Sequence, residues 1–178
     1  MKFNLSILLL IASSAAATAQ VKNPVSDGLR DILPGRQKNT IAAIEEMPAV
    51  KFSYKPTADQ MTFGHLVTHM IEANNALCSK ASGVSEPKVT EVKETDGKDK
   101  LVTAVKASFD FCSDALSKMD DSKLGEMTKG FGDKQVTRAW AALVLASSWA
   151  DHYGMAAMYL RLNGLTPPSA TKAPAAKK

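Results

Sequence analysis

Apolar side chains recur at three- and four-residue steps in four long segments, the spacing of helices that each bury one face. The first segment runs from Ser26 to Met47. Pro34-Gly35 interrupts it, so we expect a short helical turn, then a kink or restart, with the main helix from about Pro34. Pro48 ends the helix, because a proline disfavours helical geometry in the residue before it. Its apolar positions are Leu29, Ile32, Leu33, Ile41 and Ile44.

The second helix is predicted to begin after Thr62, whose hydroxyl can accept a hydrogen bond from a free amide of the first turn. It runs to about Ala81, and Gly83 follows as a residue suited to ending a helix. Residues 49–60 form an ordered connection before it. The core face consists of Phe63, Leu66, Val67, Met70 and Leu77.

The third helix takes about Lys100 to Met119. The fourth runs from a cap at Thr137 to Asn163, where a glycine and two prolines make a strong stop. Residues 122–136 contain three glycines and are predicted to be loop. No internal repeat and no strand-period segment of useful length is found, so the pattern predicts an all-α four-helix bundle.

The connection between the second and third helices, residues 82–99, is long and polar. A connection of this length can cross the end of a bundle, so the two helices can run parallel. Cys78 lies roughly 24 Å beyond Thr62 and Cys112 roughly 18 Å beyond Lys100 along their helices. Parallel helices therefore bring the cysteines to nearly the same height, whereas an antiparallel hairpin would separate them beyond the reach of a disulfide.

The amino terminus has the pattern of a cleaved signal peptide. Lys2 precedes an apolar run, and Ala17-Thr18-Ala19 is a small-x-small cleavage site, so residues 1–19 are excluded from the fold. The run is too short for a membrane anchor, which needs about 20 apolar residues. We expect a secreted or periplasmic protein cleaved after about Ala19, with one domain over residues 20–168 and a flexible tail over 169–178.

Composition narrows the classes of partner. The chain has 178 residues, of which 45% are hydrophobic, as suits one globular domain with a real core. Its net charge of +4 includes Lys2 and three lysines of the tail, so the folded part is nearly neutral and no nucleic-acid partner is expected. In an exported chain, an even cysteine count favours a Cys78–Cys112 disulfide; the alternative is two buried free thiols.

Most of the candidate chemistry lies on two helices. His65 and His69 are four residues apart on the second helix, so both imidazoles can point toward one ion. The third histidine, His152, lies on a mostly apolar stripe of the fourth helix, where it is either a packed core residue or a ligand. If these helices are antiparallel, His69 and His152 lie roughly 10 and 16 Å from the same end and can face each other.

Three further side chains near the end of the fourth helix are candidates for orienting a ligand at the bundle mouth: Tyr153, Tyr159 and Arg161. The alternative is aromatic packing and an arginine that extends to solvent at a helix end. The sequence lacks a G-x-S-x-G motif and a glycine-rich phosphate loop, and paired cysteines cannot act as thiolate nucleophiles.

Two segments resemble the DinB superfamily of helical bundles, in particular its small exported branch. They are MTFGHLVTHMIEANNALCSKASG and TRAWAALVLASSWADHYGMAAMYLRLNGLTPPS, and the most specific elements are D-H-Y-G, Y-L-R-L-N-G and P-P. The resemblance covers about Leu29 to Pro168. It implies helices in up-down-down-up order and a divalent metal, commonly zinc or nickel, held by one histidine of the second helix and two of the fourth.

Carried over residue by residue, the first metal ligand falls on His69 and the last on His152. The middle ligand falls on Ser148, a poor ligand for zinc or nickel. Three alternatives remain open: His65 supplies the third nitrogen, two histidines form a weak site completed by water, or no metal binds. Three protein ligands are usual for a catalytic zinc with an open position.

Relatives in this family include metal-dependent transferases and isomerases that use low-molecular-weight thiols, so the resemblance implies metal-dependent transferase or hydrolase chemistry. Export argues against thiol transfer, because bacillithiol and mycothiol are cytosolic cofactors. The leading hypothesis is an exported bundle that binds a divalent metal or a small molecule at His69 and His152. The alternative is a non-catalytic bundle with a degenerate metal site that serves as a ligand-binding or interaction protein, and a homodimer is compatible with either.

Overall fold

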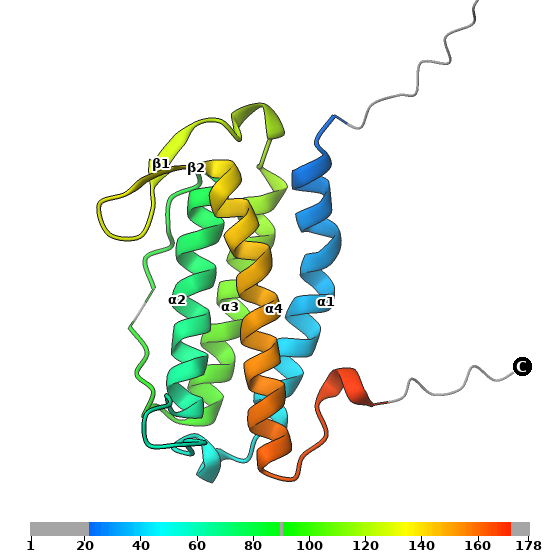
Figure 1. The fold of residues 1–178 in the computed structure, drawn as a ribbon, viewed down its shortest axis with the longest axis vertical. Coiled ribbons are helices and arrows are strands. Elements are labelled where there is room, and N and C mark those ends of the chain that lie inside the picture. The colour runs from blue at the N-terminus through cyan, green and yellow to red at the C-terminus, as the bar shows by residue number, and fades with distance from the viewer. Residues whose placement is uncertain (1–21, 90, 172–178) are drawn as a thin grey trace, which may run out of the picture.

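The computed structural model describes residues 22–89 and 91–171, and four α helices form a bundle in this part of the chain (Figure 1). The helices are α1 (Pro24–Glu46), α2 (Phe63–Ser82), α3 (Lys98–Ser117) and α4 (Arg138–Leu162). The predicted all-α four-helix bundle is therefore confirmed. The predicted signal peptide, residues 1–19, and residues 172–178 of the predicted tail lie outside the described residues. Within the described part, no helix is long and apolar enough to cross a membrane.

The helices have the predicted up-down-down-up order. In Figure 1, α2 and α3 run in the same direction and α1 and α4 run in the opposite one. The connection from α2 to α3 passes along the outside of the bundle from one end to the other, as its length indicated. Helix α2 packs against both α3 and α4 and therefore connects these two helices within the bundle.

Side-chain and glycine caps set several helix ends where the sequence predicted them. The Thr62 hydroxyl accepts a hydrogen bond from the His65 amide at 2.9 Å, and Thr137 does the same for the Trp140 amide at 3.2 Å. Gly83 ends α2 with φ of 77°, a left-handed conformation that favours glycine. These caps fix both ends of α2 and the start of α4, the two helices that carry the histidines.

The expected interruption of the first helix is wrong, because α1 continues through Pro34. A proline within a helix removes one backbone hydrogen bond and destabilises it by about 3 kcal/mol. Pro34 is exposed, however, while Leu33 before it and Ala43 and Ile44 after it are buried in the same core. Packing on both sides of the proline therefore holds one continuous helix.

The predicted loop before α4 contains a small hairpin. Strands β1 (Met127–Lys129) and β2 (Gln135–Thr137) pair antiparallel, with Thr128 opposite Val136. Three residues per strand carry too little alternation to be recognised in a sequence. The hairpin lies at the end of the bundle where α4 begins, so its loop can reach the space beside that helix (Figure 1).

Covalent and polar links tie α2 to its neighbours in the core. Cys78 of α2 and Cys112 of α3 form a disulfide with their Cα atoms 5.2 Å apart, which requires the similar heights expected of parallel helices. One turn away, the buried Asn74 amide donates to Ser108 Oγ of α3 at 3.0 Å and accepts from Trp149 Nε1 of α4 at 2.9 Å. These links fix how α2 is rotated relative to α3 and α4.

Candidate functional site

The candidate site lies between α2 and α4, where His69 and His152 face each other. Their ring centroids are 4.9 Å apart and the rings are nearly perpendicular, at 75°. Because these helices are antiparallel, positions far apart in the sequence come to the same height, as the sequence predicted for this pair. The two imidazoles border a pocket of about 330 Å³.

The walls of this pocket, here called the histidine pocket, combine acidic, hydroxyl and apolar side chains. Glu72 and Asp151 are exposed and place two carboxylates beside the histidines. Asp151 Oδ2 also accepts a hydrogen bond from Ser147 Oγ at 3.3 Å. The apolar part of the wall includes Leu77 from α2, Val144 from α4 and Phe131 from the hairpin loop.

His152 is the more enclosed of the two histidines. Burial and, to a smaller extent, the neighbouring His69 lower its pKa to about 4, and the negative charge of Asp151 only partly offsets them. The Nδ1 atom of His152 lies 3.2 Å from the hydroxyl oxygen of Ser148, one turn earlier on α4. His152 is therefore a neutral imidazole at physiological pH, with Nδ1 engaged by Ser148 and Nε2 left for another partner.

His65 is placed away from the pair. Its side chain is 56% exposed, and its Nδ1 atom lies 3.5 Å from Glu94 Oε2 on the connection between α2 and α3. The same carboxylate oxygen accepts from the Thr62 hydroxyl at 2.6 Å. His65 thus contributes to attaching this connection to the start of α2, while its assignment as a metal ligand stays a prediction.

The three residues expected at the bundle mouth do not line the histidine pocket. Tyr159 is buried against Phe63 and donates a hydrogen bond from its hydroxyl to the Met61 carbonyl at 2.7 Å. Burial, with a smaller contribution from Tyr54, raises the pKa of Tyr159. The Tyr153 hydroxyl accepts from the Ser169 amide at 2.9 Å, and Arg161 is exposed. Tyr153 and Tyr159 thus support the packing of the bundle.

The pairing of Ser148 with His152 resembles the first two members of a catalytic triad, but the surroundings do not support nucleophilic catalysis. A general base works best with a pKa near the operating pH, and the pKa of His152 is far below it. Ser148 also lies in the middle of α4, where backbone amides are engaged in helical hydrogen bonds. No oxyanion hole can be formed from those amides.

The donor set agrees only partly with the metal site that the resemblance implies. His69 and His152 converge as two nitrogen donors, but Ser148 supplies an alcohol at the third position. Among the residues that the structure describes, no three His, Cys, Asp or Glu side chains gather in a way that could hold a metal ion. The residues present therefore do not make the three-ligand set usual for catalytic zinc.

Several residues of the pocket were not singled out by the sequence. Ser147 and Asp151 flank the positions of Ser148 and His152 on α4, so helical spacing could have identified them. Phe131 enters from the hairpin loop, and no local signal in the sequence indicates that this loop reaches the pocket. Its exposed ring, 61% accessible, lies edge-on to Trp140.

Comparison with known proteins agrees with this architecture. The family model of the DinB superfamily matches residues 33–156. A DinB-like protein, YjoA, from Bacillus subtilis has a similar solved structure, with a TM-score of 0.64 and 19% identity over 78% of this chain and 93% of that one. A DinB-like protein from Bacillus cereus ATCC 10987 has a TM-score of 0.65 and 16% identity over 80% of this chain and 95% of its own. No curated protein matches the chain.

At such low identity, the two solved structures establish the likeness of fold alone. The family model covers more than half of the sequence, including α2 and both histidines of the pocket. The four-helix architecture and the match to this model together show that the chain belongs to the DinB superfamily.

Proposed function

We propose that the protein is an exported ligand-binding bundle that holds a divalent metal ion weakly through His69 and His152, without catalytic activity of its own. The observation that carries the proposal is that the ring centroids of His69 and His152 lie 4.9 Å apart at the edge of a pocket.

The state of His152 supports metal binding. A metal ligand must be a neutral imidazole, and the pKa of about 4 keeps His152 neutral across the physiological range. The hydrogen bond between Ser148 and Nδ1 orients the ring, as the partners of metal-bound histidines commonly do. Glu72 and Asp151 add negative charge to the pocket wall, which favours a cation.

The small number of donors argues for a weak site. Zn²⁺ and Ni²⁺ accept imidazole nitrogen, but two protein nitrogens leave the remaining positions to water or to a small molecule. The pocket of about 330 Å³ has room for a small ligand, and its Val144 and Phe131 side suits an apolar group.

Calorimetric titration of Zn²⁺ and Ni²⁺ into metal-stripped mature protein tests this function. His69→Ala and His152→Ala are each expected to weaken binding by at least about tenfold, or ~1.4 kcal/mol. Ser148→His places an imidazole at the third position of the family set and is expected to strengthen binding by at least about tenfold. Circular dichroism establishes that each variant is folded.

His65→Ala is the matched control, because it removes an imidazole from the same helix one turn from His69. It is expected to leave the affinity unchanged, since His65 lies against Glu94. A loss equal to that of His69→Ala would favour the three-histidine alternative. A wild-type protein that binds neither ion, with variants that are only less stable, would overturn the metal-binding proposal.

Export is the second part of the proposal. It rests on the signal-peptide pattern of residues 1–19 and on the Cys78–Cys112 disulfide, which suits an oxidising compartment. Cell fractionation with mass spectrometry of the amino terminus tests it, and a mature chain beginning at Gln20 in the exported fraction is expected. A full-length chain in the cytosol contradicts it. The homodimer remains a prediction, to be checked by light scattering.

A further inference from the structure

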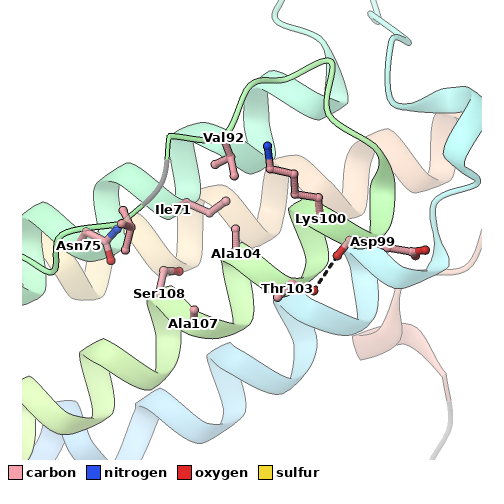
Figure 2. Close-up of a pocket in the computed structure, with 10 residues that line it drawn as sticks. Ile71, Asn75, Val92, Asp99, Lys100, Thr103, Ala104, Ala107 and Ser108 are labelled. Carbon is pink, nitrogen blue, oxygen red and sulfur yellow. Dashed lines mark hydrogen bonds between the residues drawn. The ribbon is translucent and has the colours of Figure 1, made fainter.

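A second pocket, with no lining residue in common with the histidine pocket, lies between α2, α3 and the connection that joins them (Figure 2). Its volume is about 460 Å³. Figure 2 shows Ile71 of α2, Ala104 and Ala107 of α3 and Val92 of the connection around this space, here called the crossover pocket. A volume of this size with mostly apolar walls is typical of small-molecule sites.

Asn75 is the uncommitted polar side chain of this pocket. It is 7% exposed, and its Oδ1 atom has no hydrogen-bond partner among the described residues. The preceding residue, Asn74, is different, because its amide is engaged by both Ser108 and Trp149. A buried polar atom without a partner is rare and destabilising, and it calls for an explanation such as an absent ligand or water.

Three other polar side chains of the crossover pocket, those of Ser108, Thr103 and Lys100, already have partners. Ser108 Oγ donates to the Val105 carbonyl at 2.8 Å and accepts from Asn74. Thr103 Oγ1 donates to the Asp99 carbonyl at 2.8 Å. At the mouth, Lys100 Nζ lies 2.7 Å from Asp96 Oδ2, so its positive charge is paired. The pocket therefore offers the buried Asn75 amide to a ligand and no unpaired positive charge to an anionic one.

We propose that the crossover pocket binds a neutral, mostly apolar small molecule that carries a single hydroxyl group. The apolar body packs against Ile71, Val92 and Ala104, and the hydroxyl binds the Asn75 amide. A hydroxyl can donate to Oδ1 and accept from Nδ2, so it satisfies the amide in either orientation of its side chain. The acidic side chain of Asp99, which also lines the pocket, disfavours a fatty acid or another anion.

A pair of probes of the same size isolates the role of the hydroxyl: 2-naphthol and 2-methylnaphthalene, titrated by fluorescence into mature protein. Wild type is expected to bind both. Asn75→Leu keeps the approximate size of the side chain and removes the amide. It should weaken the binding of 2-naphthol about tenfold more than the binding of 2-methylnaphthalene, which is the effect of losing one buried hydrogen bond.

Two further variants locate the binding. Ala104→Phe fills the crossover pocket and should weaken both probes by at least about tenfold. Ala76→Phe is the matched control, since Ala76 lines the histidine pocket of the same bundle, and it should leave both affinities unchanged. Circular dichroism and urea unfolding verify that all variants are folded.

Three outcomes overturn the proposal. The first is a wild type that binds neither probe up to its solubility. The second is an equal loss in Ala104→Phe and Ala76→Phe, which would place binding elsewhere. The third is an unchanged ratio of the two constants in Asn75→Leu, which would mean that water already satisfies the amide. None of these outcomes depends on whether the histidine pocket binds a metal.

Discussion

Ser148 limits what the histidine pocket can hold. It stands one turn before His152 on α4, where the family resemblance implies a histidine, and its hydroxyl lies 3.2 Å from His152 Nδ1. An imidazole at this position would add a third nitrogen donor, whereas the hydroxyl only orients the donor that is already there. This single position distinguishes the three-ligand set that the family resemblance implies from the two imidazoles that the structure brings together.

Gly64, the second residue of α2, allows the α2–α3 connection to pass close to the helix. A Cβ atom there would lie 2.4 Å from the Glu94 carbonyl oxygen, which is backbone and cannot easily move aside. Gly64→Ala should therefore lower the free energy of unfolding by about 1–3 kcal/mol, the usual effect of overpacking. Urea unfolding followed by circular dichroism measures the change.

Gly154 provides the control for this substitution. It lies within α4, and a Cβ atom added there meets nothing within 4 Å. Gly154→Ala should raise the free energy of unfolding by about 0.5–1 kcal/mol, because alanine loses less conformational freedom in a helix. If both substitutions stabilise the protein, the close passage of the connection at Gly64 is not a constraint.

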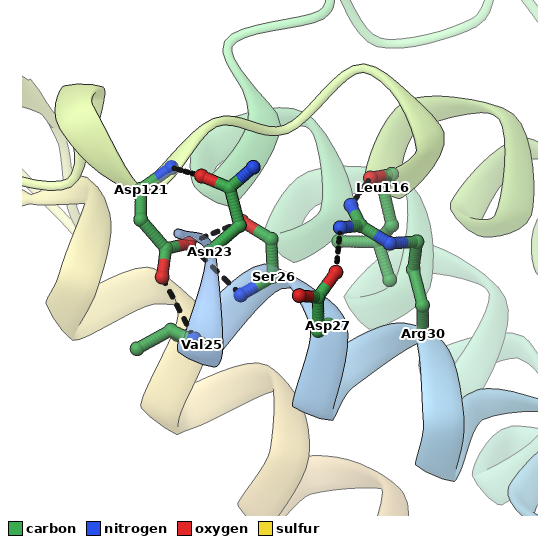
Figure 3. Close-up of polar contacts among 7 residues, drawn as sticks. All are labelled: Asn23, Val25, Ser26, Asp27, Arg30, Leu116 and Asp121. Carbon is green, nitrogen blue, oxygen red and sulfur yellow. Dashed lines mark hydrogen bonds and ion pairs between the residues drawn. The ribbon is translucent and has the colours of Figure 1, made fainter. Parts of the chain in front are cut away.

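Among the helices, α1 depends on another segment for its amino-terminal cap. Asn23 at its own N-cap position makes no side-chain capping bond. Instead, Asp121, which follows α3, accepts from the amides of Val25 at 2.8 Å and Ser26 at 2.9 Å (Figure 3). The same carboxylate accepts from the Ser26 hydroxyl. The start of α1 is thus tied to the α3–α4 connection.

Removing this cap should destabilise the bundle. Asp121→Ala is expected to lower the free energy of unfolding by about 1 kcal/mol, as other cap substitutions do. Asp121→Asn keeps one acceptor oxygen and should lose less, which makes it the matched control. Urea unfolding of the two variants measures both changes. If both variants lose the same unfolding free energy, the acceptor oxygens of the cap are not the cause of the destabilisation.

The contribution of this cap should also depend on pH. Burial opposes the charged form of Asp121, but the hydrogen bonds from Ser26 and Val25 and the charge of Arg30 lower its pKa below 3.8. The unfolded state therefore binds the proton more tightly, and the stabilisation is present above pH 3.8 and is lost as pH falls through the lowered pKa. The difference between wild type and Asp121→Ala should shrink in that acidic range, and a constant difference would contradict the assignment.

For the whole molecule, the disulfide acts mainly on the unfolded chain. Cys78 and Cys112 are separated by 34 positions, so their link restricts a large loop when the helices are not formed. Replacing both by alanine should lower the free energy of unfolding by about 3–4 kcal/mol. Reductant should lower the stability of wild type and leave the double variant unchanged. A free-thiol titration of unfolded, unreduced protein that finds two reactive thiols would contradict the pairing.

Much of the fold could be predicted because its signals are local. Thr62, Gly83 and Thr137 act within one helical turn, so the ends that they set can be recognised without knowledge of the rest of the chain. The continuity of α1 could not be predicted in this way, because it results from burial on both sides of Pro34. The β1–β2 hairpin was missed because each strand has three residues.

The sequence predicted a smaller part of the candidate sites than of the fold. Helical spacing and helix direction were enough to bring His69 and His152 to one height, and the family resemblance pointed to Ser148. The placement of His65 against Glu94 depends on the path of the α2–α3 connection. The entry of Phe131 depends on the hairpin, and the unpartnered Asn75 depends on how α2 is rotated against α3.

The sequence by itself determined where the four helices lie along the chain, because periodicity and caps are properties of single helices. With the helix directions indicated by the connection length and the family resemblance, the rise per residue also gave the heights of the paired histidines and cysteines. Only the tertiary structure decided which side chains meet. His65 turns to the connection, Ser148 to His152, and Asn75 to a pocket under the connection. These choices follow from the rotation of each helix about its axis, which is set by packing of the shared core and by links between helices such as Cys78–Cys112.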